Sequence, residues 1–476
     1  MNNTLPMPLK VRAYAHQQAA FDMVCEQFGL LTQRVLSRGV CLLMQMGCGK
    51  SLVAIAVIGI LYQLGLINRV LIVGPLSTLS VWEEQLDAFA AFPYTLTILK
   101  GSSAKKREQI QNVPATGLQI IVVNYESARI LKEELVAWRP QMTVADEGHK
   151  LKENRSQQSK AMHQIGDVSQ YRLLLTGTVI SGKELDVFSQ YRFANKYIFG
   201  TSFYAFRNRY FDMLGYGNHT PVFRKALMDE FLQKMHSIAF RTTKEECLDL
   251  PEITEEVYPV ILEDKAMKQY QELMKESYTK LQGEDVSAPN VLTKLLRLSQ
   301  LTGGFLTDDE GNCSAVSTAK LEALSDIMDS SLAGGKKLVV IARFKAEMDA
   351  IEGMIQKKKV KYSVIRGGIK DRDVQIQNFQ NDPETMIFLG QVAAAGLGIT
   401  LTAASTMVFY SLDYSMSNFD QCKSRIHRIS QRKNCHYIYL CCRNTVDTKV
   451  LRSLRNKINL AKSLVDDYRN GRNPYI

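Results

Sequence analysis

Three short segments carry residues whose types and spacing suit the binding and hydrolysis of a nucleotide. The first is Met46-Gly47-Cys48-Gly49-Lys50-Ser51, which lies between an apolar stretch at residues 40–44 and an apolar helical stretch. Glycines there let backbone N–H groups surround phosphate oxygens, while Lys50 reaches the β- and γ-phosphates and Ser51 ligates Mg²⁺. The strict pattern has a further glycine where this chain has Met44, and a plain glycine turn before a helix is the alternative. We therefore predict a phosphate loop for ATP and Mg²⁺.

An acidic pair follows a later apolar stretch. Asp146-Glu147-Gly148-His149 comes directly after residues 142–145. A carboxylate at the end of a strand, in the same α/β layer as a phosphate loop, is placed to hold Mg²⁺, and a second one to orient and deprotonate the attacking water. Adjacent acids are common on protein surfaces, but the apolar strand before them favours a site. We predict Asp146 as a metal ligand and Glu147 as the catalytic base.

Two arginines lie near the other end of the chain, within the segment 421–431. Arg425 and Arg428 are three residues apart, so a helix would project both from one face. Guanidinium groups that face a γ-phosphate neutralise the charge that develops during transfer. A solvated basic helix is the alternative. The first and last segments together predict one ATP site assembled from two parts of the chain, so that hydrolysis opens and closes a cleft like a motor stroke.

The elements that must position these residues follow an α/β rhythm. Apolar runs of strand length occur at 40–44, 70–73, 120–123, 142–145 and 172–175, and again at 255–261, 337–342, 362–365, 386–389, 406–410 and 436–441. Runs this apolar indicate parallel strands that are covered on both faces. We predict two tandem α/β lobes, residues 1–180 and 255–445, each a parallel sheet with helices on both faces.

Two further segments differ from this rhythm. Residues 181–254 are rich in aromatic and basic side chains without strand periodicity, and we predict a helical insertion and inter-lobe connection there. Its aromatic stripe favours helix core over a platform for stacking bases. Residues 446–476 are predicted to form a basic amphipathic helix that packs across the lobes.

Composition narrows the class of protein. The formal charge of +11 and the sequence pI of 9.0 favour a polyanionic partner such as nucleic acid, although a generically basic protein is the alternative. Nine cysteines without a CxxC pair indicate reduced thiols rather than a zinc site. The longest apolar stretch, residues 52–67, is too short to span a membrane. We expect a soluble intracellular protein without a membrane partner, in a bacterial or phage-infected cytoplasm, with the nucleus left open.

In their order along residues 9–460, these segments resemble the motifs of superfamily-two helicases, and among them the Snf-type translocases of double-stranded DNA. Arg241-Thr242-Thr243-Lys244, followed by Leu248-Asp249-Leu250-Pro251, is similar to the inter-lobe connection that favours this group. The resemblance implies RecA-like lobes. It also implies nucleotide contacts at Gln17, Gly47, Cys48, Gly49, Gly398 and Gln421, nucleic-acid contacts at Thr78, Tyr125, Arg343, Gly367 and Thr402, and coupling of hydrolysis to motion at Thr176 and Thr178.

The chain also departs from the family pattern. Met44 and Gln45 stand where an acidic pair is common, and the other differences are at Gly148, Val179, Ala395, Thr400, Ser424 and Ser430. None removes a charged or metal-binding group, so the predicted chemistry stands. The compact chain is typical of a phage or bacterial enzyme.

The motifs leave several functions open. The favoured one is an ATP-dependent translocase or helicase on duplex or branched DNA, with replication or recombination proteins as possible partners. The alternatives are a strand-separating helicase at forks of DNA or RNA, and a nucleotide-gated nucleic-acid-binding module with slow turnover. Intact Lys50, Glu147 and Arg428 argue against the binding module.

Overall fold

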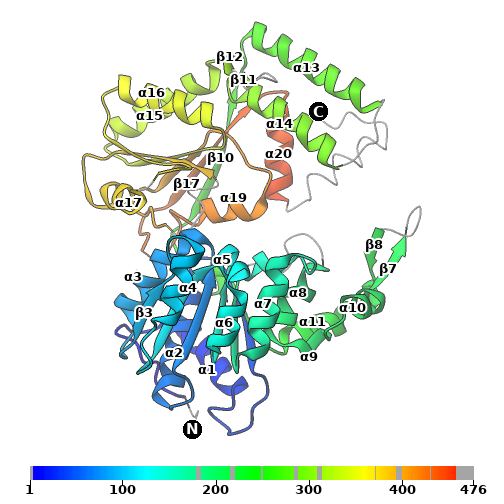
Figure 1. Cartoon of the computed structure of the whole chain (residues 1–476). Coiled ribbons are helices and arrows are strands. Elements are labelled where there is room, and N and C mark those ends of the chain that lie inside the picture. The colour runs from blue at the N-terminus through cyan, green and yellow to red at the C-terminus, as the bar shows by residue number, and fades with distance from the viewer. Residues whose placement is uncertain are drawn as a thin grey trace. The chain divides into compact units, whose positions relative to one another are not determined.

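The computed structural model describes residues 4–177, 184–214, 220–247, 250–282, 288–307, 313–369, 371–392, 399–428 and 430–456 (Figure 1). The chain divides into two compact units, Met1–Asp249 and Leu250–Ile476. The domain boundaries expected at residues 180, 254 and 445 stay predictions.

The first unit contains a seven-stranded parallel sheet in the order β3-β4-β2-β5-β6-β1-β9. Its strands are β1 (Gly39–Met44), β2 (Arg69–Gly74), β3 (Thr95–Ile98), β4 (Gln119–Asn124), β5 (Met142–Asp146), β6 (Tyr171–Leu175) and β9 (Ala239–Thr242). Every residue of β1, β4 and β5 is buried, which explains why these strands appear in the sequence as continuous apolar runs. All five strands predicted for this lobe are present.

Helices cover both faces of this sheet. They are α1 (Ala15–Gln27), α2 (Lys50–Gln63), α3 (Leu79–Phe89), α4 (Ser103–Gln111), α5 (Tyr125–Ile130), α6 (Lys132–Trp138) and α7 (Gln157–Val168), with short 3₁₀ turns at Leu76–Thr78 and Gly148–Leu151. Because side chains alternate along a strand, Val40 and Leu42 enter one core with Phe21 of α1, whereas Cys41 enters the other core with Met162 of α7. The predicted α/β class is confirmed.

The segment after β6 is mainly helical, as predicted, but it also contributes strands. Its helices are α8 (Asp186–Ala194), α9 (Lys196–Phe199), α10 (Phe203–Tyr210), α11 (Met228–His236) and α12 (Lys244–Cys247), with a 3₁₀ turn at Lys225–Leu227. The prediction lacked an antiparallel hairpin, β7 (Phe211–Leu214) with β8 (Thr220–Phe223), and strand β9, which joins the first sheet beside β1. Strand β9 has only four residues, two of them polar, which is too few to show strand periodicity in the sequence.

The aromatic residues of this segment form a core rather than a stacking platform. Phe199 packs against Phe231 with ring centroids 5.2 Å apart, and Phe206 packs against Tyr210 at 5.3 Å. All four rings are buried. The favoured interpretation of the aromatic stripe is therefore confirmed for these residues.

The second unit contains a six-stranded parallel sheet in the order β10-β17-β16-β13-β15-β14. Its strands are β10 (Ile253–Val260), β13 (Leu338–Ala342), β14 (Tyr362–Ile365), β15 (Ile387–Gln391), β16 (Thr406–Phe409) and β17 (Cys435–Cys442). A small antiparallel pair, β11 (Phe305–Thr307) with β12 (Cys313–Ala315), lies outside this sheet. All six strands predicted for this lobe are present.

The helices of the second unit are α13 (Asp264–Gln282), α14 (Ala288–Thr302), α15 (Ala319–Ala333), α16 (Lys345–Lys357), α17 (Arg372–Asn381), α19 (Met416–Lys423) and α20 (Val446–Arg455). Helix α20 places Val450, Leu451 and Leu454 in the core of this same unit. Residues 457–476 of the predicted C-terminal helix lie outside the described residues. Among the helices that the structure describes, none combines the length and apolar character needed to cross a membrane.

Candidate nucleotide-hydrolysis site

The predicted phosphate loop joins the buried strand β1 to helix α2. Gly47 and Gly49 have φ angles of +91° and +85°, which glycine adopts without the strain that a side chain would cause. A Cβ atom on Gly49 would also collide with the side-chain amide of Gln17. Both glycines are therefore required by the local backbone, and the loop delivers Lys50 and Ser51 to the first turn of α2.

Helix α1 holds this loop from one side. The Gln17 side-chain amide donates to the Cys48 carbonyl at 3.2 Å and accepts from the Tyr14 N–H at 3.0 Å. His16 Nε2 lies 2.9 Å from the same Cys48 carbonyl. Gln17 is buried, and the structure assigns it to shaping the phosphate loop, while its expected contact with adenine stays a prediction. No sequence motif singled out His16 for this contact.

Lys50 folds back over the loop. Its ammonium donates to the Met44 carbonyl, the last of β1, at 2.8 Å, and its side chain is buried. An ammonium carries three donors, so Lys50 keeps further N–H groups for phosphate oxygens. The geometry fits the predicted phosphate-binding lysine.

Asp146 ends β5 at the carboxyl edge of the sheet, the edge at which the phosphate loop leaves β1. The Trp82 indole N–H donates to Asp146 Oδ2 at 3.0 Å, and the Tyr125 hydroxyl donates to the Asp146 carbonyl at 2.7 Å. Burial, and next the charge of Glu147, raise the pKa of Asp146 to about 6, against the lowering effects of Trp82 and Lys50. Because the ionised form of Asp146 is destabilised in this way, a nearby cation would stabilise it, and its carboxylate oxygens suit Mg²⁺.

Glu147 has an unusual backbone. Its φ angle is +52°, a left-handed conformation that is uncommon outside glycine and is concentrated at functional sites. Its carboxylate lies 3.3 Å from Nδ1 of His149, and both side chains are largely buried. A Cβ atom on the next residue, Gly148, would collide with Leu174 of β6, which explains glycine where the family pattern has alanine.

In the second unit, Arg425 and Arg428 do not share a helix face, because α19 ends at Lys423. Both instead lie in the turn that follows, and both guanidinium groups donate to the Ile399 carbonyl at 3.2 Å. Arg428 also donates to the Thr400 hydroxyl at 2.8 Å, so this departure from the family pattern supplies an acceptor. Burial lowers the pKa of Arg428. The prediction that a helix projects both arginines from one face is therefore wrong. The two guanidinium groups instead meet at the Ile399 carbonyl.

Comparison with known families places this site in context. The model of the SNF2-related domain matches residues 17–303, and that of the helicase conserved C-terminal domain matches residues 319–430. The chain belongs to the SNF2-related family. This confirms the assignment made from the motifs and their order.

Three relatives illustrate this SNF2-related membership. Chromodomain-helicase-DNA-binding protein 1-like of Mus musculus is 25% identical over 438 residues, 89% of this chain and 47% of the relative. The DNA repair and recombination protein RAD54-like of Danio rerio is 24% identical, covering 89% and 63%. An uncharacterized ATP-dependent helicase of Mycoplasma genitalium is 25% identical, covering 83% and 37%. The chain spans about half the length of these curated relatives.

Among solved structures, the SWI2/SNF2 ATPase core of Sulfolobus solfataricus in complex with dsDNA aligns with 99% of this chain and 96% of that chain. The TM-score is 0.46 and the sequence identity is 23%.

The predicted nucleic-acid contacts of this SNF2-related chain differ in exposure. Thr78 and Tyr125 are buried: the Thr78 hydroxyl donates to the Pro75 carbonyl at 3.0 Å, and the Tyr125 hydroxyl supports Asp146 as described above. Both hydroxyl groups therefore have partners within the first unit, and Tyr125 positions Asp146. A nucleic-acid role for these two residues stays a prediction.

The remaining three predicted contacts lie in the second unit. The Arg343 guanidinium stacks over Tyr414, 3.8 Å from the ring centroid. Gly367 is exposed and its N–H donates to Gln391 at 3.2 Å, and the Thr402 hydroxyl lies 3.1 Å from the Ser430 hydroxyl. Gly367 is exposed, Arg343 and Thr402 are half-buried, and a nucleic-acid role for all three residues stays a prediction.

The predicted coupling and nucleotide-binding roles of four further residues stay predictions. Thr176 is buried and its N–H donates to the Leu42 carbonyl of β1 at 3.1 Å, which connects it directly to the strand before the phosphate loop. Gln421 is buried, and its carbonyl accepts from Arg425 Nε at 2.9 Å. Thr178 and Gly398 lie outside the described residues.

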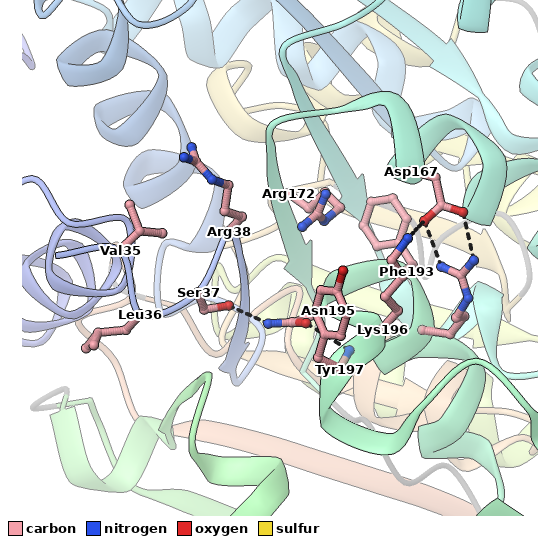
Figure 2. A pocket seen from close by; sticks show the side chains of 11 residues that line it. Val35, Leu36, Ser37, Arg38, Asp167, Arg172, Phe193, Asn195, Lys196 and Tyr197 are labelled. Carbon is pink, nitrogen blue, oxygen red and sulfur yellow. Dashed lines mark hydrogen bonds and ion pairs between the residues drawn. The ribbon is translucent and has the colours of Figure 1, made fainter. Parts of the chain in front are cut away.

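A separate hollow of about 410 Å³ lies at the opposite edge of the first sheet, near the amino ends of β1 and β6 (Figure 2). Four of its lining residues are basic, and each already has a partner; Arg38 lies over the Tyr171 ring, 5.5 Å from its centroid. Arg192 makes a bidentate contact with Asp167 at 2.7 and 3.0 Å, Lys196 lies 3.3 Å from Asp167, and Arg172 donates to the Ala194 carbonyl at 2.9 Å. These contacts hold α7, α8 and α9 together, which accounts for the charge of the hollow.

Proposed function

We propose that this chain is an ATP-dependent DNA translocase. One observation carries the proposal: the phosphate loop and the acidic pair emerge at the same edge of one parallel sheet, and the acidic pair is held there by Trp82 and Tyr125. A phosphate-binding lysine and a buried carboxylate at one sheet edge suit hydrolysis of a nucleoside triphosphate.

Each predicted site residue has a separate role in the proposed hydrolysis. Backbone N–H groups of the phosphate loop and the Lys50 ammonium bind the phosphates, and Ser51 and Asp146 are the groups that would hold Mg²⁺. The bound cation would neutralise charge on the β- and γ-phosphate oxygens. Glu147 orients the attacking water and accepts its proton. Thr176 links this chemistry to β1, and Arg425 and Arg428 are proposed to supply positive charge during hydrolysis.

DNA is the nucleic acid along which we propose that the chain moves. The excess of basic residues, +11 in total, suits a polyanion. The names of two relatives given above refer to DNA binding or to DNA repair and recombination. Duplex or branched DNA is favoured, with contacts to the phosphate backbone and weak sequence preference.

The proposal is tested by measuring ATP hydrolysis without nucleic acid and with single-stranded DNA, duplex DNA, forked DNA and RNA. We expect the largest stimulation with duplex or forked DNA. Lys50→Ala abolishes this stimulation, because the phosphates lose their only lysine partner in the loop. Equal rates with every nucleic acid and with none would contradict the proposal.

Strand separation is the second candidate activity, and it requires a different assay. Displacement of a third strand from a triplex reports movement along a duplex, whereas release of an arm from a fork reports unwinding. We expect triplex displacement. Unwinding without displacement would exclude a pure duplex tracker and favour the strand-separating helicase.

A further inference from the structure

Two cysteines that are far apart in the sequence meet beside the phosphate loop. Cys48 lies in the loop between Gly47 and Gly49, and Cys247 ends the short helix α12. Their Sγ atoms are 3.6 Å apart, although 199 residues separate them in the chain. The contact lies within the first unit.

The topology explains why these thiols meet. β1 and β9 are adjacent parallel strands with Met44 opposite Thr242, so the segments that follow them leave the sheet at the same edge. The Gln45 N–H donates to the Thr242 carbonyl at 3.0 Å, which keeps the two exits together. Cys247 also packs against the core that contains Cys48. The proximity of the thiols is therefore a consequence of strand pairing.

The two thiols differ in access to solvent. Cys48 is fully buried, whereas Cys247 is partly exposed and its thiol donates to the Thr243 carbonyl at 2.9 Å. A small oxidant in solution therefore reaches Cys247 first. A buried second thiol within contact distance then resolves the oxidised one before further oxidation.

We propose that Cys48 and Cys247 form a redox modification site, at which a peroxide converts the two thiols into a disulfide that impairs the phosphate loop. The Cys247 thiol loses its proton, and its sulfur attacks one oxygen of hydrogen peroxide; the O–O bond breaks, Cys247 becomes a sulfenic acid, and the departing hydroxide takes up a proton to give water. The Cys48 thiol then loses its proton, and its sulfur attacks the Cys247 sulfur; the S–O bond breaks, and the departing hydroxide takes up the second proton to give a second water. In total, two thiols and one peroxide give one disulfide and two waters.

The bond requires movement of the loop. A disulfide has an S–S length of about 2.05 Å, so the sulfur atoms must approach from 3.6 Å. Cys48 lies between two glycines with left-handed φ angles, and its carbonyl is the acceptor for Gln17 and His16. Pulling this residue toward α12 displaces the backbone N–H groups proposed to bind phosphates. This consequence rests on the proposed function, whereas formation of the bond does not.

The experiment exposes the full chain to hydrogen peroxide and then maps disulfide-linked peptides by mass spectrometry without reduction. We expect a linked pair containing Cys48 and Cys247, and a fall in ATP hydrolysis of at least about tenfold, because the loop is misplaced, that dithiothreitol reverses. Cys247→Ser retains its activity under peroxide. Cys313→Ser removes an exposed thiol in the second unit and serves as the matched control, which we expect to respond like the wild type.

Each contrary outcome has a definite meaning. Absence of the linked pair at a peroxide dose that already oxidises Cys313 overturns the site, and this result on the wild type does not depend on how any variant folds. A linked pair with unchanged nucleotide binding and hydrolysis overturns the effect on the loop. If the chain hydrolyses no ATP at all, the proposed function fails, while the peptide map still decides whether the disulfide forms.

Discussion

Asp146 illustrates how single contacts define the site. Its carboxylate accepts from the indole of Trp82, a residue 64 positions earlier in the chain, and its carbonyl accepts from Tyr125. Trp82 and Tyr125 can affect hydrolysis without contacting the nucleotide. Groups that orient a metal-binding carboxylate commonly affect activity as much as some ligands do.

The role of Trp82 can be tested by Trp82→Phe, which keeps most of the apolar ring but removes the N–H donor. We expect DNA-stimulated ATP hydrolysis to fall about 10–100-fold, with a higher Mg²⁺ concentration needed for half-maximal rate. The chain has one other tryptophan, Trp138, on α6, and Trp138→Phe is the matched control. An unchanged Mg²⁺ dependence in Trp82→Phe would contradict the positioning role.

Gly148 offers a second test at this scale, through its contact with Leu174. Gly148→Ala forces a methyl group against this side chain and should lower the free energy of unfolding by about 1–3 kcal/mol. Adding Leu174→Ala creates room for the methyl group. Denaturant unfolding of both single variants and the double variant should show a double variant more stable than the sum of the two losses predicts; strict additivity would disprove the clash.

At the scale of elements, a buried histidine connects α7 to α8. His163 Nε2 lies 2.9 Å from the Ser189 carbonyl, and burial lowers the pKa of His163 to about 4. The folded chain therefore binds this proton less readily than the unfolded chain, whose histidine has its ordinary pKa of about 6.5. Relative to the state in which His163 is protonated, the neutral imidazole adds to the free energy of unfolding. This addition is fully present above pH 6.5 and is lost as the pH falls toward 4.

We expect this histidine to account for a loss of up to about 3 kcal/mol in the stability of the first unit between pH 6.5 and pH 4. His163→Gln keeps an N–H donor but does not titrate in this range. Thermal unfolding of this variant should show a shallower pH dependence than the wild type over that interval. Parallel pH profiles would show that His163 is not the responsible group.

The sequence predicted elements well where their signals are local. The apolar strands of both sheets, the glycine loop and the acidic pair are contiguous in the chain, and each was located. Strand β3 was missed because it lies at the sheet edge and is only partly buried, and β9 because it is too short. No glycine or proline in residues 416–431 signals that α19 ends at Lys423, so the position of the arginines depends on tertiary contacts.

The site was predictable to a similar extent. Lys50, Asp146 and Glu147 follow from motifs, whereas the contacts of Trp82, Tyr125 and His16 join residues from different elements. The approach of Cys247 to Cys48 required knowledge that β9 pairs with β1. Sequence patterns therefore identified the chemical groups, and the structure supplied the partners that orient them.

At the scale of the whole molecule, the chain consists of two compact α/β units. The SNF2-related match covers most of the first unit and extends into the second, and the helicase C-terminal match lies within the second unit. The proposed catalytic base, Glu147, lies in the first unit. Loss of the Glu147 carboxylate should therefore have the most direct effect on hydrolysis.

The most direct test is the rate of duplex-stimulated ATP hydrolysis by Glu147→Gln. This change removes the proposed base while it preserves the size of the side chain, and Glu153→Gln makes the same chemical change at an exposed position nearby. We predict a loss of at least about a hundredfold for Glu147→Gln, with ATP and DNA binding retained, and wild-type rates for Glu153→Gln. Full duplex-stimulated hydrolysis by Glu147→Gln would contradict the proposed site.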